Sequence, residues 1–427
     1  MDRKIQPEIQ TLKNFRILPP VRMTLPNGIP LTVINAGEQE VVRIDVLFAG
    51  ARWQQSQKLQ ALFTNRMLRE GTTKYTAATI AEKLDYYGSW LELSSSSEYA
   101  YITVYSLNKY LAKTLEVVES MIKEPLFPEK ELNTILDTNI QQYLVNTSKV
   151  DFLAHRSLLK SLYGEQHPCG KIVVEEDYHA ITPEVLREFY ERYYHSGNCS
   201  IFLSGKVTED IISRVAATFG TSFGQNQQPV SRLRLPFTAV PGKRIFTERE
   251  DAMQSAVKMG YTTITRNHPD YLKLRVLMTL FGGYFGSRLM SNIREEKGYT
   301  YGISAGIMFY PDSGLLAIST ETDNEYVEPL IQEVYHEIDR LHQEPVSAEE
   351  LTIVRNYMLG EMCRSYESPF SLSDAWIFIA TSGLDDDYFS RSLLAVNEVT
   401  PAEIQDLAQR YLCKETLKEV IAGKKLS

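Results

Sequence analysis

Residues 181–207 read ITPEVLREFYERYYHSGNCSIFLSGKV, and residues 399–425 read VTPAEIQDLAQRYLCKETLKEVIAGKK. The Thr-Pro, Arg-Tyr and Gly-Lys pairs of the first stretch recur in the second, each displaced by 218 positions. A weaker similarity relates residues 124–132 to residues 344–351, at a displacement of about 220. A period this long is far above that of a solenoid repeat. The sequence therefore predicts two domains of one shared architecture, as after a duplication.

The segment between the two predicted domains is rich in Gln, Pro and Gly, which is typical of a linker. It reads GQNQQPVSRLRLPFTAVPGK over residues 224–243. We therefore expect an N-terminal domain over 1–224, a linker over 225–243 and a C-terminal domain over 244–427.

Each predicted domain mixes the periodicities of strands and helices. Alternating residues predict half-buried strands over 42–48 and 99–106, and a third strand is expected over 315–320. Apolar residues at helical spacing predict five helices: 59–67 with Gly71 as a C-cap, 80–87 ending at Gly88, 111–122, 271–280 and 327–341. Because strands and helices do not alternate regularly, we expect an α+β fold of antiparallel sheets packed by helices.

Composition excludes several classes of protein. The chain has 427 residues, 43% of them hydrophobic, and a formal net charge of −9, which argues against a general nucleic-acid binder. The four cysteines lie far apart and form no CxxC, so neither a disulfide framework nor a zinc ribbon is expected. The start, MDRKIQPEIQ, lacks the apolar core of a secretion signal. We expect a soluble protein with no membrane or nucleic-acid partner, in the cytoplasm or alternatively in the periplasm.

A set of short motifs follows one another along the chain. In the first half these are LPNG (25–28), LTV (31–33), GAR (50–52), GT (71–72), Gly88, Gly164 and HPCG (167–170). In the second half they are GG (282–283), SRL (287–289) and REEKGYTY (294–301). This ordered set resembles the insulinase/pitrilysin family of zinc metallopeptidases (inverzincins), and especially its short subunits. The resemblance covers residues 20 to 424 and implies two homologous domains of the LuxS/MPP-like metallopeptidase fold.

The resemblance also locates the family's inverted zinc motif, HxxEH, on the helix before Gly71. Counted back from that residue, the motif falls on LFTNR, residues 62–66. Leu62 and Arg66 then stand at the two histidine positions, and Asn65 stands at the position of the catalytic Glu. Leucine has no lone pair, arginine is permanently charged and asparagine is not a base. The resemblance thus implies a degenerate motif and no zinc in this chain. Arg66 either points into the former metal cavity or lies on the surface.

The family's third zinc ligand is a Glu that lies roughly 70 residues or more farther along the chain. This sequence has no Glu between Glu131 and Glu165, and Thr138 lies near the expected place. The seven histidines include no pair at i,i+4 spacing and no HExxH motif. We interpret two of them, His167 and His195, as loop or strand-edge residues.

In the resembled family, the domain opposite the zinc carries an Arg and a Tyr that line the substrate groove. Arg294 and Tyr301 match these positions within REEKGYTY. The resemblance implies that the Tyr hydroxyl supports the developing oxyanion and that the Arg holds a substrate carbonyl or fixes the Tyr. The alternative is a salt-bridged Arg and a packed Tyr left over from ancestry. For Arg288, on the same expected helix, we favour a structural ion pair.

Two hypotheses for the function follow. In the first, the chain is the non-catalytic subunit of a heteromeric zinc peptidase, and a homologous HxxEH partner supplies the zinc. Arg294 and Tyr301 would then act in trans on unstructured peptides in a closed chamber. In the second, the chain is an inactive scaffold or peptide-binding homologue that could form a homodimer. We expect no activity from the chain alone, and the acidic balance of charge suggests that basic peptides are tolerated.

Overall fold

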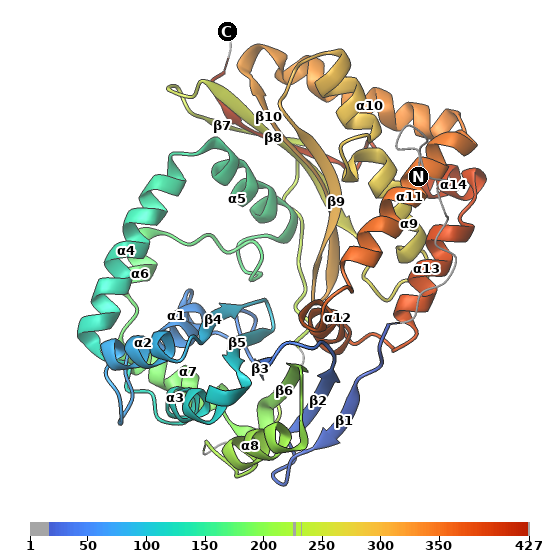
Figure 1. Ribbon diagram of the computed structural model, residues 1–427. Helices are drawn as coiled ribbons and strands as arrows, with labels where there is room; N and C mark the ends of the chain where they lie inside the picture. The colour runs from blue at the N-terminus through green and yellow to red at the C-terminus, as the bar shows by residue number, and fades with distance from the viewer. Residues whose placement is uncertain (1–16, 225–227, 232, 426–427) are drawn as a thin grey trace.

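The computed structural model describes residues 17–224, 228–231 and 233–425, and its elements form two similar sets (Figure 1). The first set comprises β1 (Val21–Thr24), β2 (Pro30–Asn35), β3 (Val41–Ala49), α1 (Gln60–Met67), α2 (Ala77–Tyr86), β4 (Trp90–Ser95), β5 (Tyr99–Leu107), α3 (Leu111–Lys123), α4 (Glu129–Thr147), α5 (Val150–Tyr163), α6 (Glu175–His179), α7 (Pro183–Tyr193), β6 (Cys199–Gly205) and α8 (Glu209–Phe219). The second set comprises β7 (Arg244–Glu248), β8 (Gln254–Thr263), α9 (Tyr271–Met278), η3 (Thr279–Gly283), η4 (Met290–Glu296), β9 (Ile303–Tyr310), β10 (Ser313–Asp323), α10 (Val327–Gln343), α11 (Ala348–Arg364), α12 (Pro369–Ser382), α13 (Tyr388–Glu398), α14 (Pro401–Tyr411) and β11 (Lys418–Gly423). Short 3₁₀ turns, η1 (Asn108–Tyr110), η2 (Ser196–Asn198) and η5 (Asn324–Tyr326), connect neighbouring elements.

Each set builds one sheet. The first sheet has the strand order β1-β2-β6-β3-β5-β4, and the second has the order β7-β11-β8-β10-β9. The α+β prediction is confirmed, and most neighbouring strands are antiparallel as expected, although each sheet also contains one parallel pair. The pairs β2–β6 and β7–β11 are parallel. They are parallel because the chain reaches β6 and β11 only after a long helical crossover, and such a crossover can join parallel strands.

The repeated stretch of sequence forms the same unit in both halves. Thr182 and Thr400 are the N-caps of α7 and α14, and a proline occupies the first turn of each helix. Each threonine side chain accepts a hydrogen bond from a backbone N–H of the first turn, which satisfies a donor that the helix cannot. Both helices lead into a buried strand inside a sheet, β6 or β11. The repeat therefore specifies the return of the chain to the middle of each sheet.

One face of each sheet is covered by helices from its own half. On the first sheet, α1, α3, α7 and α8 pack on the side chains of Val42, Ile44 and Val46 in β3. On the second sheet, α9, α10, α11 and α14 pack on Val257 and Met259 in β8. These two apolar clusters are the largest in the protein and form the core of each half.

The other face of the first sheet is covered by α12, a helix from the opposite half (Figure 1). Leu372 and Trp376 of α12 pack with Ile34, Leu47 and Phe202 of the sheet. This packing corrects the prediction of a half-buried strand over 42–48, because the interior residues of β3 are buried on both faces. Alternating residues along a strand predict one buried and one exposed face only when no other element covers the second face.

The second sheet receives α5 from the first half in the same way (Figure 1). Leu158 of α5 packs with Leu315 and Val420, and Ala154 of α5 packs with alanines of β8 and β11. The two halves thus exchange helices: α5 crosses to the second sheet and α12 crosses to the first. Neither half buries both faces of its sheet without the other.

Of the two glycines predicted to end helices, one does so and the other does not. Gly88 follows α2 with φ +62, and its N–H bonds to the carbonyl of Asp85, so it ends the helix as predicted. The prediction for Gly71 as a C-cap is wrong, because α1 ends at Met67. Gly71 instead forms a β-bridge with Thr76 at φ +147, a conformation that favours glycine.

The described part of the expected linker is extended and makes contacts with both halves. Residues 225–227 and 232 lie outside the described residues. The Leu235 N–H donates to the carboxylate of Asp312 at 3.0 Å, and the Val240 N–H donates to the carbonyl of Ser161 at 2.8 Å. Leu235 also packs in the apolar cluster beside α5. This segment is therefore part of the junction between the halves.

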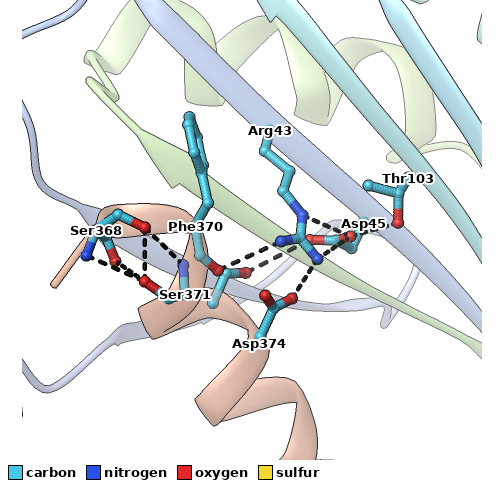
Figure 2. Close-up of polar contacts among 8 residues, drawn as sticks. Arg43, Asp45, Thr103, Ser368, Phe370, Ser371 and Asp374 are labelled. Atoms are coloured by element: carbon cyan, nitrogen blue, oxygen red, sulfur yellow. Dashed lines mark hydrogen bonds and ion pairs between the residues drawn. The ribbon is translucent and has the colours of Figure 1, made fainter. Parts of the chain in front are cut away.

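A buried ionic cluster joins β3 to the first turns of α12 (Figure 2). Arg43, which is 8% exposed, donates to the fully buried Asp45 at 2.8 and 2.9 Å and to Asp374 of α12 at 2.6 Å. Thr103 donates to Asp45 at 2.6 Å. Burial raises the pKa of Asp45, and the Arg43 guanidinium and the Thr103 hydroxyl oppose that rise. Asp45 thus depends on Arg43 for its compensating charge.

We predict that Arg43→Met lowers the free energy of unfolding by about 3–5 kcal/mol, because it leaves the Asp45 carboxylate buried without a cation. The double variant Arg43→Met, Asp45→Leu should recover most of that loss, since it removes both charges. Thermal unfolding monitored by circular dichroism measures both effects. A double variant no more stable than Arg43→Met would contradict this account of the cluster.

Candidate functional site

The residues at the predicted zinc-motif positions lie on α1, which packs between α7 and the strands β4 and β5. Leu62 is half-buried and packs on the core of the first half. Asn65 is buried, and its amide donates to the carbonyls of Ser94 at 2.7 Å and Tyr101 at 3.2 Å. Its side-chain oxygen accepts from the Tyr194 hydroxyl at 3.2 Å. The Asn65 amide is thus fully used in fixing α1 to the sheet.

Arg66 is half-buried and reaches α4. Its Nη1 donates to Oδ1 of Asn139 at 2.6 Å, and its guanidinium lies 6.0 Å from the centre of the Phe63 ring. Asn139 in turn donates to the carbonyl of Ile135. Of the two placements left open for Arg66, the structure has the inward one. Thr138, the residue nearest to the expected third ligand, is exposed and bonds within its own helix.

Asn139 is a site residue that sequence reasoning missed. It lies 73 positions after Arg66 and is the α4 residue that faces it. The signal available in the sequence was the helical period, which places residue 139 one turn after the half-buried Ile135. Thr138, one residue earlier, does not lie on the side of α4 that faces Arg66.

The side chains at these four positions do not fit a zinc ion. Zinc sites are built from thiolate, imidazole and carboxylate ligands, and here the set is an aliphatic group, two amides and a guanidinium. The cation of Arg66 occupies the approach to Asn139. Across the described residues, no group of three or more His, Cys, Asp and Glu side chains comes together as metal ligands would. No chemical step is therefore assigned to a metal in this chain.

Arg294 lies in η4, a π-helical segment that ends at Glu296 and is followed by Gly298 with φ +69. Segments of this kind are rare and are often found at functional sites. The Arg294 guanidinium lies 4.7 Å from the ring centre of Phe285, which is itself 59% exposed. No carboxylate among the described residues pairs with Arg294. The alternative of a salt-bridged Arg is therefore absent from the described structure.

Tyr301 stands on the loop between η4 and β9 and is 90% exposed. The loop itself is anchored, because the Thr300 hydroxyl donates to the carbonyl of Glu321 at 2.6 Å. A hollow of about 320 Å³ opens beside Tyr301, and Asp151 of α5 lines its other side. The tyrosine hydroxyl has no hydrogen-bond partner among the described residues. A fixed loop thus presents a free phenol group to the surroundings.

Other residues of the second-half motifs have structural roles. Arg288 forms a two-bond ion pair with Glu350 of α11 at 2.8 and 2.9 Å, as predicted. Gly282 lies against Ala305 of β9 so closely that a Cβ would approach its atoms to 2.6 Å. This glycine allows the close packing of η3 on the sheet.

The buried nucleophilic and basic groups of the first half are not activated. Burial raises the pKa of the Cys169 thiol to about 12, so the thiol stays protonated. Burial lowers the pKa of His167 and of His195, which favours neutral imidazoles. His167 lies in an aromatic cluster with Tyr163 and Trp53. These groups act in packing.

Among the described helices, none is long and apolar enough to cross a membrane.

Comparison with known proteins agrees with this geometry. The family model described as "Insulinase (Peptidase family M16)" matches residues 49–171, and the one described as "Peptidase M16 inactive domain" matches residues 180–358. The chain belongs to the M16 peptidase family. The two matches together cover well over half of the chain, and the second half carries the family's inactive type of domain.

Three similar proteins illustrate the relationship. An uncharacterized zinc protease of Bacillus subtilis is 24% identical over 351 residues, covering 81% of this chain and 84% of that protein. The M16 inactive-domain peptidase structure from Pseudomonas fluorescens has a TM-score of 0.86 at 22% identity, covering 96% of this chain and 99% of that one. A chain of Complex III2 from Candida albicans has a TM-score of 0.74 at 12% identity, covering 94% and 95%. At these identities the two structures show the shared fold alone.

We predict that Leu62→His, Arg66→His and Asn139→Glu together create a zinc site. The two histidines would lie at i and i+4 on α1, and the contact between residues 66 and 139 would supply the carboxylate. Equilibrium dialysis followed by metal analysis should find stoichiometric zinc in the folded triple variant.

The matched control carries Thr138→Glu in place of Asn139→Glu. Its carboxylate would point along the exposed side of α4, so it should bind zinc far more weakly. Equal binding by the two variants, or no zinc in a folded triple variant, would show that these positions do not correspond to the zinc motif.

Proposed function

We propose that this chain is the non-catalytic subunit of a heteromeric M16 peptidase. A homologous partner bearing HxxEH would supply the zinc and the general base. This chain would supply Arg294 and Tyr301 to the opposite side of the peptide groove, in a chamber that admits unstructured peptides. The relatives named as zinc proteases support the reaction class, because peptide hydrolysis is what such a partner would perform.

The observation that carries the proposal is a contrast between the two sites. On α1 every polar group at the motif positions is bonded within the chain. Arg294 and Tyr301 are instead held on anchored backbone with no polar partner for the side chains among the described residues. A phenol hydroxyl held in this way can donate to an oxyanion that forms on a substrate bound between subunits.

The second candidate is an inactive scaffold or a peptide-binding homologue, as a heteromer or a homodimer. The similarity in fold to a chain of Complex III2 favours it, because it shows that this fold occurs inside a large assembly. In that case Arg294 and Tyr301 would have no role in turnover. For either candidate we propose the cytoplasm as the compartment, because all four cysteines are free.

We predict that Tyr301→Phe lowers the turnover number of the complex with its HxxEH partner by about 10²-fold, the effect of losing one oxyanion donor. The change in KM should be small, since the hydroxyl would act in the transition state. The measurement is steady-state hydrolysis of a quenched fluorescent peptide by the purified complex.

Tyr86→Phe is the matched control, because Tyr86 is 80% exposed on α2 in the other half. Assembly of each variant with the partner is checked by size-exclusion chromatography. If Tyr301→Phe assembles normally and turns over like the Tyr86 control, the proposed role of Tyr301 is wrong. If the native chain purifies without any HxxEH homologue, the scaffold hypothesis takes its place.

A further inference from the structure

A hollow of about 430 Å³ lies between the loop after β3, the helix α5 and the segment that leads from α5 to α6. Figure 1 shows this last segment running back from α5 toward α4 and α6. The volume is within the range of pockets that bind small ligands or peptide side chains. Its lining includes Trp53, Phe152 and Leu159, so the walls are partly apolar.

The charged residues that line this hollow all have one sign. They are Arg52, Lys58, Arg156 and Lys171, and no Asp or Glu belongs to the lining. This is unusual in a chain whose formal net charge is −9. Like charges gathered in a partly enclosed space repel one another and attract an anion, because the surrounding protein screens them less than water does.

Among the described residues, a carboxylate neutralises only one of the four cations. Lys58 pairs with Asp177 of α6 at 2.9 Å. Arg156 donates to the carbonyl of Val173 at 2.7 Å, and Arg52 donates to the Ser97 hydroxyl at 3.3 Å. Neither of these two, nor Lys171, has a carboxylate partner among the described residues. Three cations therefore face the hollow without a counter-charge.

A series of aromatic contacts leads from the hollow to the degenerate zinc motif on α1. Arg156 stacks on Tyr143, 5.8 Å from its ring centre, and the ring of Tyr143 lies 5.6 Å from that of Tyr178. Tyr178 in turn lies 6.1 Å from Phe63 of α1, whose ring carries the Arg66 guanidinium. A row of aromatic rings flanked by arginines thus connects the hollow with the motif positions.

A larger hollow shows that this charge pattern is not general. It has a volume of about 890 Å³ and lies beside the β4–β5 and β9–β10 turns. There Arg234 and Arg266 are accompanied by Glu98, Asp312 and Asp374. Its three carboxylates outnumber its two cations, so it offers an anion no comparable attraction.

We propose that the basic hollow binds a carboxylate of an extended peptide, either an acidic side chain or the C-terminal group, as the peptide passes α1. This assignment rests on the proposed function in that the ligand is a peptide. It differs from the expectation, drawn from net charge alone, that basic peptides are tolerated. Arginine and lysine bind carboxylates through charge-assisted hydrogen bonds, and Trp53 and Phe152 would cover the neighbouring apolar part of the peptide.

The test is fluorescence anisotropy of the purified full chain with rhodamine-labelled unstructured peptides that differ only by Glu or Gln at one central position. A C-terminally amidated version of each peptide distinguishes a terminal carboxylate from a side chain. We expect the peptide with the recognised carboxylate to bind about tenfold tighter or more, the usual effect of one charge-assisted hydrogen bond. The preference should shrink as salt is added.

The double variant Arg52→Gln, Lys171→Gln should abolish this preference, because both side chains are exposed and neither is needed for the core. Its matched control is Lys113→Gln, Lys130→Gln, which removes the same charge from exposed positions of α3 and α4 outside the hollow. Equal binding of all the peptides, an unchanged preference in the double variant, or displacement of the peptide by micromolar inorganic phosphate would overturn the proposal.

These results separate the two proposals. The anisotropy measurement uses this chain alone and needs no partner, so a carboxylate preference can be found even if no HxxEH subunit exists. In that outcome the proposed peptidase function fails and the binding site stands. Conversely, a complex that hydrolyses peptides with no preference between Glu and Gln, while Tyr301→Phe impairs it, would keep the function and remove the carboxylate site.

Discussion

The exchange of helices between the two sheets is the constraint on which the rest of the structure depends. Each sheet has two apolar faces, and each half covers only one of them with its own helices. The helices α12 and α5 cover the remaining faces, so separating the halves would expose Leu47 and Phe202 on one side and Leu315 and Val420 on the other. At roughly 1.5–3 kcal/mol for each large apolar side chain, exposing these four would cost about 6–12 kcal/mol, which is comparable with the whole stability of a typical domain.

The same exchange positions the candidate sites. The α4–α5 arm starts beside α1, where Asn139 meets Arg66, and ends on the second sheet, where Asp151 lies beside Tyr301. Its continuation to α6 supplies Lys171 to the basic hollow. Motions that change the distance between the sites must therefore break the packing of α5 on β8 and β11. The proposed carboxylate site, which is built in part on this arm, would be held in shape before a peptide arrives, and this would reduce the entropy lost on binding.

The sequence predicts the elements and repeats that depend on a short stretch of chain. It does not predict contacts between residues that lie far apart along the chain. The repeat of 181–207 in 399–425 predicted two similar halves, and helical spacing predicted the helices α1, α2, α3, α9 and α10, because each of these signals lies within a short stretch of chain. The burial of β3 on both faces depends on α12, more than 300 residues away, and no local pattern contains that contact. At the candidate site, the position of Arg66 was left open and Asn139 was missed, because the register between α1 and α4 is a tertiary property.

The two candidate sites differ in where their polar groups find partners, and this difference has a physical meaning. Around α1, Asn65, Arg66 and Asn139 satisfy one another or the backbone, so the helix keeps its place with no ligand at all. A buried polar group left unpaired would cost stability, which explains why amides and a guanidinium bonded in this way can stand at those positions. Tyr301 contributes no such bond, and at 90% exposure its ring gains almost nothing from burial. Its anchored loop and the neighbouring π-helical segment η4 fix the position of the tyrosine, although its hydroxyl has no partner among the described residues. An interface with a substrate or a second subunit would give the hydroxyl a hydrogen-bond partner.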